Sequence, residues 1–113
     1  MADLYKHAME VLSFSEGDES ASITLGYVFD GTDPGYPFKL AVNITYMLGR
    51  DASCSSKCPS TFTCTTSVRN DMRDGSPLPF FNGWHSYFKV KDISKAVGRL
   101  RARPPPFAAH PSR

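Results

Sequence analysis

The stretch FKLAVNITYML at residues 38–48 is the clearest strand signal in the chain. Its apolar side chains recur at every second position: Phe38, Leu40, Val42, Ile44, Tyr46 and Leu48. Successive side chains of a strand point to opposite faces, so this alternation predicts a strand with one buried face and one polar face. Asn43 falls on the polar face. The rest of the expected fold is arranged around this strand.

Two further strands are expected beside it. Residues 21–29 alternate in the same way, with Ile23, Leu25, Tyr27 and Phe29 on one face. The turn cluster DGTDPG at residues 30–35 separates these two strands, because glycine supplies positive φ and proline fixes φ. A third, short strand is expected at residues 61–68.

Two helices are also expected. Asp3 is placed to cap a helix over residues 3–13, whose apolar stripe is Leu4, Ala8, Val11 and Leu12. Near the other end, a strand at residues 84–90 places His85 on its polar face. A helix at residues 92–100 follows, capped by Asp92 or Ser94, with Ile93, Ala96, Val97 and Leu100 at helical spacing. We expect Val97 and Leu100 to be buried, and the fold class to be α+β.

Composition indicates one small domain. The chain has 113 residues, is 41% hydrophobic and carries a formal net charge of +2. This charge is too small to indicate a nucleic-acid partner. No apolar run reaches the roughly 18 residues of a membrane span, and no secretory leader is readable, so we expect no membrane association and a cytoplasmic location. The expected domain covers residues 1–103, with a Cys/Ser/Pro-rich insertion at residues 50–81 and a Pro-rich flexible tail at residues 104–113.

Several short sequence motifs resemble those of the glyoxalase I (lactoylglutathione lyase) family of the vicinal-oxygen-chelate superfamily. The word NGWHSYFKVKDI at residues 82–93 is similar to the family's Gly-x-His motif that leads into a short helix. Residues 6–14, 23–27 and 43–49 resemble three further family words in the right order. The resemblance covers about two thirds of the chain.

The resemblance implies a βαβββ-type module, incomplete at both ends, with a mostly antiparallel curved sheet and two helices. It implies isomerisation of the methylglyoxal–glutathione hemithioacetal to lactoylglutathione, with Zn²⁺ or Ni²⁺ in the site. It also implies a small-molecule substrate, the glutathione adduct, and a homodimer.

The same resemblance places His85 on the family's histidine metal ligand and Asn43 on a family glutamate ligand. The remaining ligands would lie before Met1 and beyond Arg113, so the chain looks truncated relative to the family. No catalytic residue is assigned. The alternatives are a catalytically inactive, metal-free member that binds a small ligand or a partner, and a partial or spliced product.

The cysteines offer a second metal hypothesis. Cys54, Cys58 and Cys64 could form a Cys₃His zinc site with His85, although their spacing is wider than usual on the second side. Free thiols in a loop are the simpler interpretation. The chain contains neither a Gly-x-Ser-x-Gly nucleophile elbow nor a glycine-rich phosphate loop after a strand.

Overall fold

The structure is a computed structural model that describes residues 4–51, 53 and 59–101. The chain divides into two compact units, Met1–Phe80 and Phe81–Arg113, and each is described by itself. We call the first the sheet unit, and residues 81–101 of the second the C-terminal arm.

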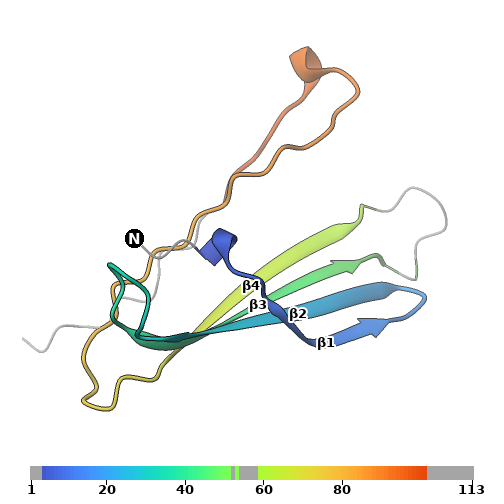
Figure 1. The fold of residues 1–113 in the computed structure, drawn as a ribbon. Helices are drawn as coiled ribbons and strands as arrows, with labels where there is room; N and C mark the ends of the chain where they lie inside the picture. The colour runs from blue at the N-terminus through green and yellow to red at the C-terminus, as the bar shows by residue number, and fades with distance from the viewer. Residues whose placement is uncertain (1–3, 52, 54–58, 102–113) are drawn as a thin grey trace, which may run out of the picture. The chain divides into compact units, whose positions relative to one another are not determined.

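The sheet unit contains one four-stranded antiparallel sheet (Figure 1). Its strands lie side by side in chain order: β1 (Glu10–Glu16), β2 (Ser20–Asp30), β3 (Lys39–Gly49) and β4 (Thr61–Asn70). A short 3₁₀ helix, η1 (Leu4–Lys6), precedes the sheet. The strands predicted at residues 21–29, 38–48 and 61–68 are thus confirmed as β2, β3 and β4, and β4 lies within the segment expected to be an insertion.

The core lies against β3. Register pairs join β3 to β2 from Lys39 to Gly49, and β3 to β4 over ten residues. Leu40 and Val42 are fully buried, and Phe29 of β2 completes the small core on the same face. The apolar side chains at alternate positions of β3 are therefore buried, as predicted, at the end of the strand that contains Leu40 and Val42.

The turn between β2 and β3 depends on its glycines. Gly31 has φ +87° and Gly35 has φ +80°, a backbone region that strains any side chain larger than hydrogen. Asp30 Oδ1 accepts a hydrogen bond from the backbone N–H of Thr32 at 3.0 Å. The predicted turn at residues 30–35 is confirmed.

The helix predicted at residues 3–13 is wrong, because β1 occupies its second half. Val11 pairs with Leu25 and Phe14 with Ile23, with a bulge between Val11 and Ser13. The Leu12 side chain lies over Gly26, which has no side chain to obstruct it. Hydrogen bonding to β2 outweighs the weak helical spacing, because propensity is a small term beside a paired backbone.

The strand and helix predicted in the C-terminal arm are also wrong. Residues 84–90 form no strand, and the helix is reduced to η2 (Ile93–Lys95). Asp92 does cap this turn, accepting from Ser94 N at 3.0 Å, but Ala96 is already extended at φ −76° and ψ 133°. A short helix needs an apolar surface to pack against, and within the arm none covers it.

The α+β glyoxalase module is therefore incorrect as a fold class. In the part of the chain that the structure describes, the architecture is a mostly antiparallel sheet with 3₁₀ turns and no α-helix. Among the same residues, no helix is long and apolar enough to cross a membrane.

Two leucine substitutions test which unit supplies the core. Leu40 is 1% exposed, so Leu40→Ala should lower the free energy of unfolding by about 2–5 kcal/mol through lost burial and an unfilled cavity. Leu100, expected from the sequence to be core, is 95% exposed, so Leu100→Ala should change stability by less than about 0.5 kcal/mol. Urea denaturation of both variants measures the contrast, and equal losses would contradict the core assignment.

Candidate functional site

Asn43 lies in the middle of β3 on the face opposite the core. It pairs in register with Gly26 of β2 and Ser67 of β4, and its side chain is exposed. Thr24 and Thr45, which pair two residues further along the two strands, share a hydrogen bond of 2.9 Å between their Oγ1 atoms. The predicted polar face of β3 is confirmed, and its local chemistry is that of hydroxyls and amides.

His85 lies in the C-terminal arm. Its side chain is exposed, and its ring centroid is 5.4 Å from that of Tyr87 at an interplanar angle of 59°. Residues 81–90 contain no helix, turn or bend, so the imidazole is carried on irregular chain.

The cysteine hypothesis is only partly covered by the described residues. Cys64 is a free, half-buried thiol in β4, opposite Tyr46 of β3. Cys54 and Cys58 lie outside the described residues, so the Cys₃His zinc site stays a prediction.

A metal centre is not assembled in the described part of the chain. Across residues 4–51, 53 and 59–101, no three His, Cys, Asp or Glu side chains are grouped to hold an ion. Asn43 belongs to the sheet unit and His85 to the arm, so the pairing of the two as metal ligands stays a prediction.

One cluster of polar and aromatic side chains was not predicted. Ring contacts join His7 to Tyr27 at 4.5 Å, Tyr27 to Phe29 at 4.8 Å, and Phe29 to Tyr36 at 5.4 Å. His7 Nε2 also lies 3.6 Å from Asp33 Oδ2. This cluster, which we call the aromatic cluster, fixes the turn after η1 against the end of the sheet where the core lies.

Charge and burial both act on Tyr27. Burial, followed by the negative charges of Asp33 and Asp30, holds the pKa of the Tyr27 hydroxyl above its ordinary value. Burial also raises the pKa of the Tyr36 hydroxyl, which donates a hydrogen bond of 3.1 Å to the Pro79 carbonyl. Both phenols therefore stay protonated at neutral pH, and the Tyr36 hydroxyl acts as a hydrogen-bond donor.

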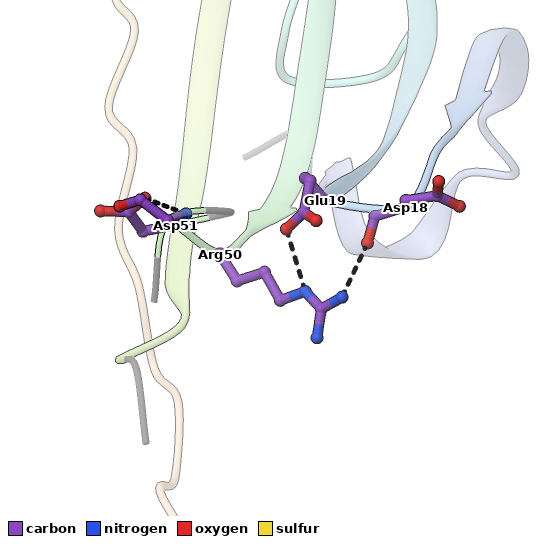
Figure 2. A network of polar contacts seen from close by, with 5 residues as sticks. Asp18, Glu19, Arg50 and Asp51 are labelled. Atoms are coloured by element: carbon purple, nitrogen blue, oxygen red, sulfur yellow. Dashed lines mark hydrogen bonds and ion pairs between the residues drawn. The ribbon is translucent and has the colours of Figure 1, made fainter. Parts of the chain in front are cut away.

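A network of polar contacts lies at the end of the sheet away from the aromatic cluster (Figure 2). Arg50 Nε donates to Glu19 Oε2 at 3.1 Å, and the Arg50 terminal nitrogen donates to the Asp18 carbonyl at 3.3 Å. The Arg50 backbone N–H donates to the Glu19 carbonyl at 2.9 Å. Both side chains of the ion pair are exposed, so the pair adds at most about 1 kcal/mol and serves to hold the β1–β2 turn beside the end of β3.

The family of the chain follows from a profile match that spans both units. The family model described as aldose 1-epimerase matches residues 10–102, which include all four strands and the described arm. The chain belongs to the aldose 1-epimerase family. No curated protein and no solved structure matches it.

This membership corrects the glyoxalase assignment. The resemblance to glyoxalase I is wrong, and with it the glutathione adduct as substrate and the lyase reaction. The lyase-type zinc centre on His85 and Asn43 loses its basis, since no metal-binding group is found in the described residues. The expectation that the chain binds Zn²⁺ or Ni²⁺ stays a prediction from sequence.

The aromatic cluster did have a signal in the sequence. Tyr27, Phe29, Tyr36 and Phe38 are four aromatic residues that flank one Gly/Pro turn. Aromatic side chains on both strands of a hairpin face each other when their register matches. His7 carried no comparable signal, because it was assigned to a helix that does not form.

The pKa of Tyr27 tests the electrostatics of the aromatic cluster. Asp33→Asn removes an anion that disfavours tyrosinate, so it should lower the pKa of Tyr27 toward its ordinary value. Asp18→Asn, an equal loss of charge in the β1–β2 turn, should leave that pKa unchanged. An NMR titration of the Tyr27 ring measures both, and an unchanged pKa in Asp33→Asn would show that the two groups do not interact.

Proposed function

We propose that the chain contributes to a carbohydrate epimerase of the mutarotase type, which interconverts the two configurations at C1 of an aldose. The observation that carries the proposal is the family match over residues 10–102. This match includes both the sheet and the arm, so both are assigned to the same activity.

The reaction defines the side chains that are needed. An aldose inverts at C1 when its hemiacetal ring opens, the C1 carbonyl rotates and the ring closes on the other face. Opening removes a proton from the C1 hydroxyl and delivers one to the ring oxygen, so the reaction needs a general base and a general acid near neutral pH. No redox step and no covalent enzyme intermediate are required.

His85 is the residue best suited to move these protons. Histidine is the side chain that titrates nearest neutral pH, and His85 is the single histidine between residues 10 and 102, since the others are His7 and His110. Its side chain is exposed, so it is open to a substrate. The Tyr87 ring beside it offers an aromatic face and a hydroxyl for orienting a sugar.

In this proposal the sheet acts as the rigid scaffold. Catalytic groups need supports whose own positions are fixed by packing. The buried Leu40 and Val42, the aromatic cluster and the Tyr36–Pro79 hydrogen bond fix the sheet unit as far as Pro79, two residues before the arm.

We also propose that two copies of the chain associate, as predicted from the sequence. β1 and β4 form the edges of the described sheet, and edge strands readily pair with other chains. Phe14 and Leu48 add exposed apolar surface near one end of the sheet. The cytoplasmic location likewise stays a prediction.

The activity is tested by anomer interconversion. Starting from a pure α-aldose, the chain should speed the approach to equilibrium above the spontaneous rate, and His85→Ala should remove most of that acceleration, about 10²-fold or more. His110→Ala, outside the matched residues, should retain it. NMR signals of the anomeric proton follow the reaction, and full activity in His85→Ala would assign proton transfer to another residue.

A further inference from the structure

Charge is unevenly divided between the two units. Residues 1–80 contain six Lys or Arg and ten Asp or Glu, a net formal charge of −4. The arm, residues 81–101, contains five Lys or Arg and one Asp, a net formal charge of +4. The modest net charge of the whole chain therefore conceals a strongly cationic segment that carries His85.

Within the described part of the arm, most cations form no ion pair. Lys95 Nζ lies 3.6 Å from Asp92 Oδ2, the one acidic side chain of the arm. Within the described residues no ion pair involves the other four cations, Lys89, Lys91, Arg99 and Arg101, and all are exposed. Four exposed cations on the segment that carries His85 favour binding of an anion from solution.

Two of these cations follow His85 at alternate positions. Residues 81–90 contain no helix, turn or bend, and the ring contact between His85 and Tyr87 shows that residues two apart approach each other. Lys89 continues the same alternation, and Lys91 follows at the bend. In an extended chain, His85 and Lys89 are separated by about 13 Å, a gap that the long lysine side chain partly spans.

We propose that the aldose acted on by this chain carries an anionic group, a phosphate ester or a carboxylate, which Lys89 and Lys91 bind while C1 lies at His85. This inference rests on the proposed function, because it takes His85 as the group that acts at C1. The lysines are binding residues only. They hold the substrate and take no part in proton transfer.

A small anion fits these observations better than a polyanion. Aromatic residues interleaved with cations are also typical of single-stranded nucleic-acid binding, and Trp84, Tyr87 and Phe88 precede Lys89. A nucleic acid, however, extends over many phosphates and is repelled by the −4 charge of residues 1–80. A sugar with one anionic group needs to engage the arm alone.

The fluorescence of Trp84 supplies the binding measurement. It is the single tryptophan of the chain and lies next to His85. Four ligands are titrated at low salt: a neutral aldose, its phosphate ester, the corresponding uronic acid and inorganic phosphate. The ester should bind about tenfold tighter than the neutral sugar, with the uronic acid in second place if a carboxylate also fits, and added salt should reduce the difference.

Matched variants identify the residues. The double variant Lys89→Gln/Lys91→Gln should lose the preference for the ester and keep the affinity for the neutral sugar. Arg73→Gln, which removes a similarly exposed cation in the turn after β4, should keep the preference. Circular dichroism checks that each variant retains the sheet.

Each other outcome contradicts a stated part of the proposal. Equal affinity for ester and neutral sugar, or a preference that survives in the double lysine variant, overturns the anionic substrate while leaving the epimerase intact. Inorganic phosphate that binds as tightly as the ester shows ion binding alone. Tighter binding of a single-stranded oligonucleotide supports the nucleic-acid alternative, and failure of every aldose to bind the folded chain overturns both proposals.

Discussion

The constraint on which the described structure depends is the central position of β3. This strand is paired on both sides, to β2 along its whole length and to β4 along ten of its residues, and it supplies the two fully buried side chains, Leu40 and Val42. An inner strand satisfies its backbone hydrogen bonds while burying alternate side chains, so β2 and β4 take their register from β3, and β1 in turn pairs with β2. The aromatic cluster packs at the end of the sheet where this core lies.

Sequence patterns predicted β2, β3 and the turn between them, because neighbouring residues in the sequence are enough to specify these elements. Strict alternation over residues 38–48 and 21–29, with a Gly/Pro turn between them, specifies a hairpin without reference to the rest of the chain. The helical spacing of Leu4, Ala8 and Leu12 was equally local and failed, since β2 offered residues 10–16 a paired backbone. The pairing of β1 with β2 decided the structure of residues 10–16, and the pattern of one segment alone does not reveal such a pairing.

The helix predicted in the arm was wrong for the opposite reason: a contact that it needs is missing within the arm. Residues 92–100 have a cap and an apolar stripe, yet the cap forms only one turn, because no surface within the arm buries Ile93, Val97 and Leu100. A stripe predicts a helix only where something covers it. The same segment led to the wrong family, because a histidine followed by a strand-like and helix-like pattern is compatible with unrelated folds.

The sequence singled out His85, which stays a prediction as a site residue, whereas the glyoxalase chemistry assigned to it is wrong. One histidine within a short motif indicates a functional residue, while the reaction depends on what surrounds it. In the function that we propose from the family match over residues 10–102, proton transfer at a sugar takes the place of metal-assisted chemistry, and the cations of the arm bind the substrate. The aromatic cluster was missed because its members come from three segments: the turn after η1, strand β2 and the β2–β3 turn.

Amide hydrogen exchange tests most directly the claim that β3 organises the fold. The account predicts the slowest exchange at the hydrogen-bonded amides of β3, intermediate exchange in β2 and β4, and rapid exchange throughout residues 93–100. Slow exchange with helical periodicity at residues 93–100 or 4–12, together with unprotected amides in β3, would contradict it.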